Sequence, residues 1–261
     1  MFKYKLMSSK DSKSKRKKYT RDVYIYLSKL YSKAELYEEA VNFIKEFVQM
    51  DPKLNKEECD IISTVFKNMI TDKRQSWSTL HSMERREKKK KINTVKEVRE
   101  IKNHVENEIR ESCHELQAFI DKYILPNIKE NENLVFFYKL KADYYRYICE
   151  FAEGKEYENN LIKAEEFYKK AYDISEKQLP IINCNRISVV LNYSIFLYEI
   201  KKDKKTGFDI AQKTFKDCMK FYDDLEKPSF RDTLLILQLL KENIIFWNSE
   251  MTEEEEKKIV E

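Results

Sequence analysis

The sequence predicts an all-α protein built from about nine antiparallel helices, and three observations lead to this class. Only two glycines and four prolines occur among 261 residues, although hairpin turns depend on such residues. Apolar residues recur every three or four positions along most of the chain, as they do on one face of a helix. Hydrophobic residues make up 42% and charged residues 37%, with a net charge of +4, which indicates a sizeable core beneath solvated helix faces.

The first half of the chain contains four predicted helices, whose limits follow from proline, charge and first-turn residues. The first begins near Thr20 and the second extends from Tyr37 to Pro52. The third runs from Asn55 to beyond Trp77, and the fourth from Val95 to Pro126. Between the third and the fourth, residues 85–91 are almost all charged. This stretch predicts a solvated turn.

The second half contains five further predicted helices. They cover about 132–152, a segment around 161–171 before Pro180, about 184–201, a segment from near Gly207, and about 229–248 after Pro228. The short connections imply that neighbouring helices are antiparallel. We therefore expect one helical domain at residues 20–249, with a basic flexible tail at 1–19 and an acidic tail at 250–261.

Several classes of protein are excluded by what the sequence lacks. No apolar stretch is long enough to cross a bilayer, and residues 1–7 lack the apolar core of a signal peptide, so we expect the cytoplasm as the compartment and allow for entry into the nucleus. The five cysteines form no CxxC pair, and the three histidines show no metal-ligand spacing; we expect reduced thiols, no metal and no cofactor. No phosphate loop, HExxH motif or nucleophile elbow is present, so we expect no enzymatic activity.

Two predicted helices, around 186–200 and 233–247, are apolar on more than one face. Such a helix is buried on several sides or lines a groove. Each carries one amide among aliphatic residues, Asn192 or Asn243, and a buried amide must be hydrogen-bonded. From these residues alone, a core asparagine bonded to a neighbouring group is the simpler interpretation. The functional interpretation is a pair of amides that clamp an extended peptide.

Basic residues with helical spacing form a second candidate feature. Lys67 and Arg74 are two turns apart and share a helix face. Arg146 lies three residues after Asp143 and four before Glu150, where both carboxylates can hold its guanidinium. Taken alone, this pattern is best interpreted as ordinary intrahelical ion pairing.

Four longer segments carry a resemblance to a known family. Residues 138–147 (YKLKADYYRY), 191–200 (LNYSIFLYEI), 234–247 (LLILQLLKENIIFW), and the pair 66–68 and 73–77 are similar to motifs of the 14-3-3 family. The motifs occur in the family's order between about residues 21 and 249. The resemblance implies a cup-shaped bundle of nine antiparallel helices with a concave amphipathic groove, paired into a homodimer.

The resemblance also implies roles for individual residues in an adaptor that binds phosphoserine or phosphothreonine segments of client proteins. The phosphate would be held by Lys67, Arg74, Arg146 and the Tyr147 hydroxyl. The peptide main chain would be bound by Asn192 and Asn243. The groove would be lined by Lys139, Leu191, Ile195, Glu199, Leu235, Ile236, Leu239 and Trp247.

The sequence departs from the family pattern at several positions. Ser78 replaces an arginine one turn after Arg74, which removes a positive charge near the groove. At the dimer interface, Leu36, Ile101 and His104 replace the usual arginine, tyrosine and lysine. Glu108 and Glu39 therefore lack the usual basic partners. We expect a homodimer with an altered interface.

Two other hypotheses compete with that of a phosphopeptide-binding adaptor. A tetratricopeptide-like scaffold would bind unphosphorylated peptides, but the chain shows no 34-residue period. A divergent family member could have lost phosphate binding and use its basic tail for nucleic acid. Retention of Lys67, Arg74, Arg146 and Tyr147 makes nucleic acid the less favoured partner, and no membrane partner is expected.

Overall fold

All regular structure in the part of the chain that the computed structural model describes, residues 19–90, 94–225 and 227–260, is helical. Nine helices in these ranges have twelve residues or more, which confirms the all-α prediction. A four-residue helix, α9 (Tyr222–Leu225), and short 3-10 or π-helical turns connect them. The predicted basic tail at 1–19 lies, apart from Tyr19, outside the described residues.

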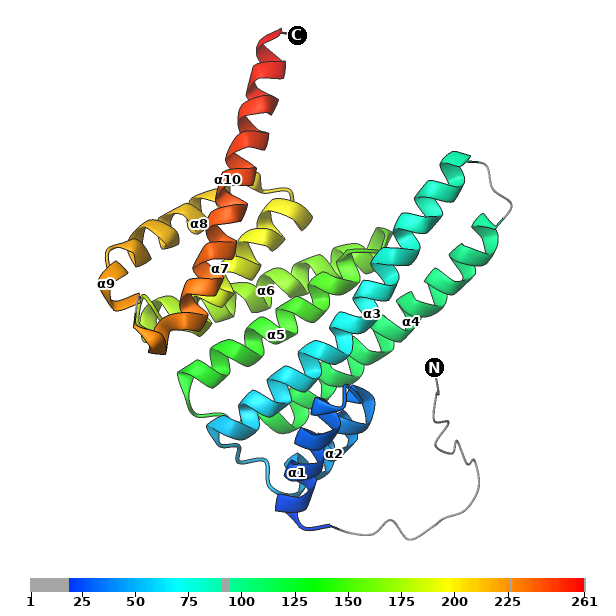
Figure 1. Cartoon of the computed structure of the whole chain (residues 1–261), viewed down its shortest axis with the longest axis vertical. Helices are drawn as coiled ribbons and strands as arrows, with labels where there is room; N and C mark the ends of the chain where they lie inside the picture. The colour runs from blue at the N-terminus through cyan, green and yellow to red at the C-terminus, as the bar shows by residue number, and fades with distance from the viewer. Residues whose placement is uncertain (1–18, 91–93, 226, 261) are drawn as a thin grey trace.

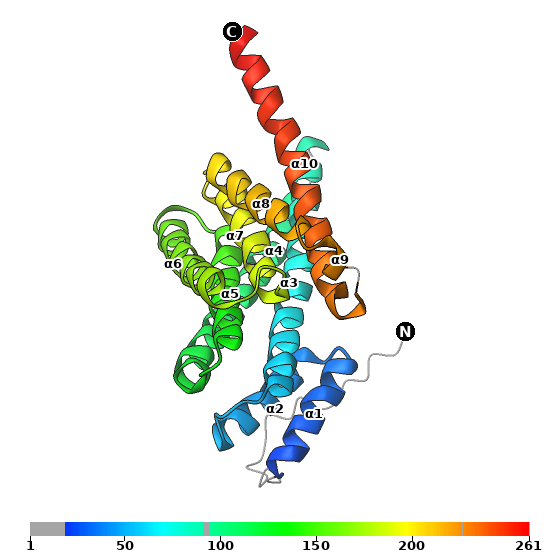
Figure 2. The same ribbon diagram turned by 90° about the vertical axis from the view of Figure 1, so that its left-hand side faces the viewer.

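The first four helices form two antiparallel pairs (Figure 1). The long helices α3 and α4 lie side by side as a hairpin, and the shorter α1 and α2 pack at the base of that hairpin in both views (Figures 1 and 2). The bounds of these helices are α1 Arg21–Lys33, α2 Tyr37–Met50, α3 Lys56–Lys90 and α4 Val95–Phe119, and α4 is extended by a π-helical turn at Ile120–Ile124.

The remaining helices lie on the other side of α5, which runs through the middle of the molecule (Figure 1). Helix α10 closes this half and extends away from the bundle towards the C-terminus (Figure 2). The bounds are α5 Asn131–Cys149, α6 Gly154–Gln178, α7 Cys184–Ile195, α8 Lys204–Met219 and α10 Arg231–Val260, and a π-helical turn at Phe196–Ile200 continues α7.

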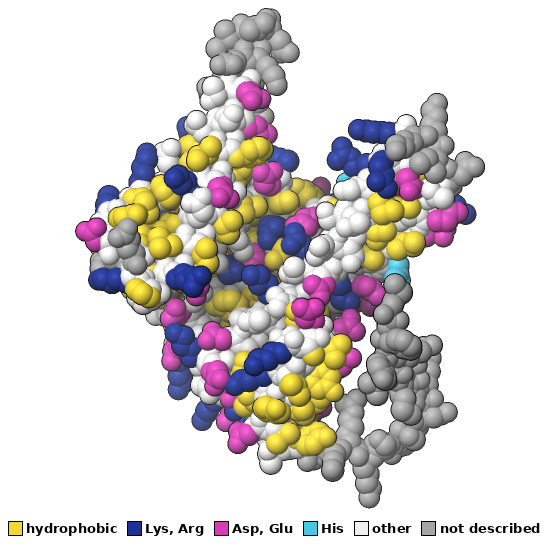
Figure 3. All heavy atoms as spheres, viewed as in Figure 1, with side chains coloured by type: hydrophobic (Ala, Val, Ile, Leu, Met, Phe, Trp, Pro, Cys, Tyr) yellow, Lys and Arg dark blue, Asp and Glu magenta, His cyan; other side chains and the backbone are white. Residues whose placement is uncertain are grey.

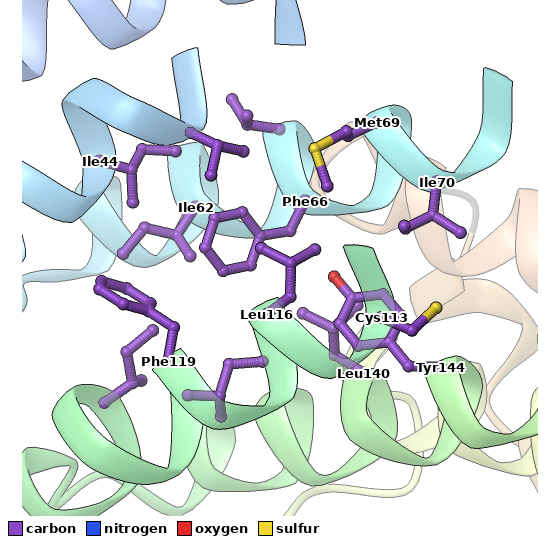
Figure 4. Packing of buried hydrophobic residues seen from close by; sticks show 14 of the residues in the cluster. Ile44, Ile62, Phe66, Met69, Ile70, Cys113, Leu116, Phe119, Leu140 and Tyr144 are labelled. Atoms are coloured by element: carbon purple, nitrogen blue, oxygen red, sulfur yellow. The ribbon is translucent and has the colours of Figure 1, made fainter. Parts of the chain in front are cut away.

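One hydrophobic core joins the first five helices. Phe66 and Ile70 of α3 face Leu116 of α4 and Tyr144 of α5, and all four are fully buried (Figure 4). At about 25 cal/mol per Å² of buried apolar surface, a fully buried side chain of this size contributes about 2 kcal/mol or more. This core fixes α3 against α5, the two helices that carry the predicted cations.

A second core fixes α7 against α8 and α10. Its buried members include Val190, Leu191, Leu237, Leu240 and Trp247. Gly207 of α8 lies so close to α7 that a Cβ atom there would approach the Ser194 carbonyl oxygen to 2.9 Å. A larger side chain would push the two helices apart, so this glycine sets how closely α8 supports α7.

Helix α3 is longer than the sequence pattern predicts. The charged stretch at 85–91 was expected to be a turn, but α3 continues to Lys90. Lysine, arginine and glutamate are good helix formers, and the Glu84–Lys88 ion pair links successive turns. Helix α10 likewise continues to Val260, beyond the expected end near residue 248. No described helix is both long and apolar enough to cross a membrane.

Candidate functional site

Helix α3 brings two cations to the side of the molecule that faces α5. Arg74 donates from Nε to Glu150 of α5 at 3.0 Å. Lys67 lies two turns earlier on the same face and is exposed, and its side chain forms no hydrogen bond or ion pair with any described residue. Because α3 is unbroken between them, both side chains are presented towards one region.

Arg74 and Arg146 meet at two shared partners. Both guanidinium groups bind Oε1 of Glu150. Both also contact the Tyr147 ring, whose centroid is 3.9 Å from the central carbon of Arg74 and 4.7 Å from that of Arg146. The Tyr147 hydroxyl has no hydrogen-bond partner among the described residues. Two guanidinium groups and a phenol from two helices therefore lie together.

Asp143 organises the next layer of the site. Its carboxylate accepts from Lys139 Nζ at 3.1 Å and from Asn192 Nδ2 at 2.9 and 3.0 Å, and it also accepts from the Tyr168 hydroxyl. Tyr168 in turn accepts from Arg146 Nε at 2.9 Å. These bonds join α5, α6 and α7 around one buried carboxylate.

The surroundings of these groups fix their charges at neutral pH. Burial opposes the charge of Asp143, but the nearby cations and the Tyr168 hydroxyl outweigh it and lower the pKa of Asp143. Burial also opposes the charge of Arg146, but the surrounding tyrosines and carboxylates outweigh it and raise the pKa of Arg146 well above its ordinary value. Burial raises the pKa of Tyr147 to about 12, so this phenol keeps its proton.

The expected ion pairs of Arg146 with Asp143 and Glu150 are present, at 3.5 and 3.3 Å. They are not the ordinary surface pairs that the local pattern favours, because only 12% of the Arg146 side chain is exposed. The role of Tyr168 was missed. It is 22 residues from Arg146, and no local spacing marks that contact.

The two asparagines have different surroundings. The Asn192 amide group donates to Asp143, as the simpler interpretation of a satisfied amide requires, although its partner is a carboxylate. This bond orients the side chain and leaves its carbonyl oxygen as an acceptor. Asn243 of α10 is half-buried and has no hydrogen-bond partner among the described residues.

Apolar residues of α7 and α10 form the opposite side of the site. Leu191 is buried and Ile195 half-buried in the second core. On α10, Leu235 and Leu239 are 60% and 50% exposed, and Ile236 is half-buried. These exposures leave apolar surface on α10 without a partner in this chain.

Phe246 belongs with these residues, although the sequence analysis did not include it. It lies eleven residues after Leu235 and seven after Leu239, spacings that share one helix face, and it is 63% exposed. Trp247, in contrast, is only 2% exposed and stacks on Tyr198 at 4.5 Å. Its Nε1 donates to Glu199 at 3.1 Å, so Trp247 supports Glu199 instead of presenting its own surface.

The surface between these elements is hollowed. In Figure 3 the hollow lies between the α3 side and the α10 side of the molecule, and both basic and hydrophobic side chains lie in it. Four cations of the site, Lys67, Arg74, Lys139 and Arg146, stand against two carboxylates, Asp143 and Glu150. The excess of two positive charges matches a phosphate monoester, which carries about −1.5 to −2.

Two residues that are expected at a dimer interface are Leu36, which immediately precedes α2, and Ile101 of α4. Leu36 is 46% exposed and Ile101 54% exposed. Glu108 lies 3.8 Å from Lys73 Nζ and 3.4 Å from His104 Nε2. Leu36 and Ile101 thus leave apolar surface exposed, and Glu108 has neighbours within this chain.

Comparison with known proteins agrees with this architecture. Residues 27–248 match the family model described as 14-3-3 protein. The chain is 36% identical to the 14-3-3-like protein GF14 epsilon of Arabidopsis thaliana, over 90% of this chain and 92% of that protein. It is 35% identical to 14-3-3 protein epsilon of Drosophila melanogaster, over 90% of both chains, and 33% identical to the checkpoint signal transducer rad25 of Schizosaccharomyces pombe, over 88% of this chain and 86% of that protein. The chain belongs to the 14-3-3 family.

Proposed function

We propose that this protein is an adaptor that binds phosphoserine or phosphothreonine segments of client proteins and has no reaction of its own. The observation that carries the proposal is the convergence of Arg74 and Arg146 on one tyrosine ring and one carboxylate. Two helices distant in sequence thus present two guanidinium groups together, with Lys67 unpaired on the same face of α3.

This arrangement suits a phosphate better than any neutral group. A phosphoserine offers three acceptor oxygens, and guanidinium groups bind such oxygens in charge-assisted pairs. Lys67 supplies a further mobile charge, and the protonated Tyr147 hydroxyl supplies a donor. An unphosphorylated serine leaves the positive charges uncompensated, so phosphorylation of the client acts as the switch.

The rest of the ligand would lie along the hollow as an extended chain. Its peptide groups would bind Asn192, already oriented by Asp143, and Asn243, which has no partner in the described chain. Its apolar side chains would cover Leu235, Leu239 and Phe246, at about 25 cal/mol per Å² of apolar area removed from water.

Titration calorimetry with two peptides of one sequence, phosphorylated and unphosphorylated, tests the proposal. We expect a Kd of about 1 μM or less for the phosphopeptide. The unphosphorylated peptide should bind at least about tenfold more weakly, a difference in binding free energy of about 1.4 kcal/mol. Lys67→Glu should abolish binding, and Lys169→Glu, a reversal at an exposed lysine of α6, should not. Equal affinities for the two peptides would favour a helical scaffold that binds unphosphorylated segments.

We also infer a homodimer whose interface is more apolar than the family pattern. Leu36 and Ile101 are exposed in the single chain, and so are Val23, Tyr26 and Leu30, which recur at spacings of three and four on α1. Sedimentation across protein concentrations should show a dimer that persists at 0.5 M salt, because apolar contacts are not screened. Dissociation at high salt would indicate an ionic interface instead.

A further inference from the structure

The face of α3 that carries Lys67 and Arg74 continues beyond the site. Lys67, Arg74, Ser78, Arg85 and Lys89 follow one another at intervals of seven, four, seven and four residues. These intervals keep side chains on one side of a helix with 3.6 residues per turn. Because α3 is helical to Lys90, this face runs unbroken from the phosphate site to the end of the α3–α4 hairpin.

Three cations at that end have no internal partner. Arg85, Arg86 and Lys89 are exposed and form no hydrogen bond or ion pair with the residues that the structure describes. Together with Ser82 they line a hollow of about 360 Å³. Basic side chains gather at this end of the molecule in Figure 3. We refer to Ser82, Arg85, Arg86 and Lys89 as the α3 tip surface.

The neighbouring cations of the hairpin differ from those of the α3 tip surface because each of them has a carboxylate partner. Glu84 is buried and binds three of them, Lys88, Arg99 and Lys102, at 2.8 to 3.0 Å. One set of cations is therefore held by Glu84, whereas Arg85, Arg86 and Lys89 have no carboxylate partner among the described residues. An anion supplied from outside would pair with them.

The distance from the phosphate site limits what that anion can be. At 1.5 Å per residue, Arg85 lies about 17 Å and Lys89 about 22 Å from Arg74 along α3. An extended peptide covers these distances in about five to seven residues. A chain whose phosphoserine is bound at Arg74 and Arg146 can thus reach the α3 tip surface.

We propose that the α3 tip surface binds a second group of oxyanions in the same client chain, either acidic residues or a second phosphorylated residue, about five to seven positions from the phosphoserine. The proposal rests on the proposed function of the site. Guanidinium groups pair with carboxylates and phosphates alike. Clients with an acidic or doubly phosphorylated segment would then be preferred over clients with phosphoserine alone.

Calorimetry with extended phosphopeptides tests this preference. Each peptide carries, beyond a five-residue Gly/Ser spacer on the N-terminal or the C-terminal side, three aspartates, one phosphoserine, or three serines as a neutral control. Each exposed ion pair is weak, but three formed together add up, so we expect one direction of extension to tighten binding about tenfold at 50 mM salt. At 300 mM salt the gain should fall to about twofold because exposed charges are screened.

The variant Arg85→Gln/Arg86→Gln/Lys89→Gln should lose this gain and still bind the unextended phosphopeptide within about twofold of wild type. A matched variant with the same loss of charge, Lys169→Gln/Lys177→Gln/Lys213→Gln, should retain the gain. A greater gain with phosphoserine than with aspartates would identify a second phosphate as the better ligand, and equal gains would identify charge alone; both support the proposal.

Two results would overturn the inference. In the first, the wild-type protein binds the unextended phosphopeptide, but an acidic or phosphorylated extension on either side does not raise the affinity. This result would leave the proposed function intact. The other is a gain that survives in the Arg85/Arg86/Lys89 variant, which would place the contact elsewhere. Failure of the wild-type protein to bind any phosphopeptide would instead overturn the proposed function, and this inference with it.

Discussion

Two buried carboxylates of this protein gather cations in similar ways and with different consequences. Asp143 accepts bonds from Lys139, Asn192 and Tyr168, and these partners lie beside the hollow between α3 and α10. Glu84 binds Lys88, Arg99 and Lys102, which join α3 to α4. In the proposed function, the first carboxylate orients donors for a ligand, whereas the second holds the two helices of a hairpin together.

The comparison shows that ion pairing alone does not mark a functional site. What distinguishes the Asp143 region is that the side chain of Lys67 beside it has no partner among the described residues, and that Arg74 shares Glu150 with Arg146, which also pairs with Asp143. In the Glu84 region, all three cations are bound directly to the one carboxylate. The difference between the Asp143 and Glu84 regions is therefore tested best by substitutions whose effects on ligand affinity and on the free energy of unfolding are both measured.

The largest effect is expected from Asp143→Asn. Loss of this charge leaves Lys139 and Arg146 buried without their common partner, which should lower the free energy of unfolding by about 3 kcal/mol. Phosphopeptide affinity should fall at least about tenfold, because Asn192 and Arg146 lose their orientation. Urea denaturation and calorimetry measure the two effects. A folded variant with unchanged affinity would show that Asp143 is as purely structural as Glu84.

Arg74→Lys should reduce affinity with little effect on stability. A lysine cannot keep both the paired bonds to Glu150 and the contact with the Tyr147 ring. We expect about tenfold weaker phosphopeptide binding, near 1.4 kcal/mol, with far-ultraviolet circular dichroism unchanged. The matched exchange Arg99→Lys in the Glu84 region should leave affinity as in wild type.

Glu84→Gln should have the opposite signature. Bonds from Lys102, Lys88 and Arg99 lower the pKa of Glu84 to about 2, so its ionised form stabilises the folded protein at pH values above about 4.3, the ordinary pKa of glutamate. This contribution is lost as the pH falls towards 2. Because these pairs lie near the protein surface, screening limits the effect, and we expect about 1–2 kcal/mol of lost stability at pH 7.

The check on Glu84→Gln is a pair of urea titrations, at pH 7 and near pH 3. The difference between the variant and wild type should shrink at the lower pH, where wild-type Glu84 begins to lose its charge. Phosphopeptide affinity should not change at pH 7. A marked loss of affinity would mean that the hairpin and the phosphate site are coupled.

The smallest effect is expected from Ser78→Arg, which restores a cation between the two regions on the same face of α3. An exposed charge there should strengthen phosphopeptide binding by about two- to fivefold, since exposed pairs contribute at most about 1 kcal/mol. Calorimetry at 50 and 300 mM salt would show the gain and its screening. Weaker binding would indicate that Ser78 lies in a sterically restricted part of the hollow.

Much of the fold could be predicted because local periodicity and proline positions mark the helices. The spacing of Lys67 and Arg74, and of Arg146 with its two carboxylates, likewise follows from helix geometry. Contacts between different helices could not be predicted from spacing within one helix. Tyr168 reaches Arg146 from another helix, and the burial of Trp247 depends on its stacking with Tyr198.

The error in the limit of α3 has a physical cause as well. The almost fully charged stretch at 85–91 predicts a turn, but residues with high helix propensity and one buried carboxylate keep α3 helical to Lys90. The extra turns carry the α3 tip surface. A pattern of charge alone therefore could not show that the face of Lys67 and Arg74 extends so far.

The central claim is that the site recognises the charge of a phosphate, and the pH dependence of phosphopeptide affinity tests it most directly. Between pH 5 and pH 7 the second ionisation of phosphoserine, with a pKa near 6, is largely completed. Over the same range the lowered pKa of Asp143 and the raised pKa values of Arg146 and Tyr147 keep these groups in fixed charge states. Calorimetry should show affinity rising by up to about tenfold from pH 5 to pH 7, whereas a flat profile would contradict recognition of the phosphate dianion.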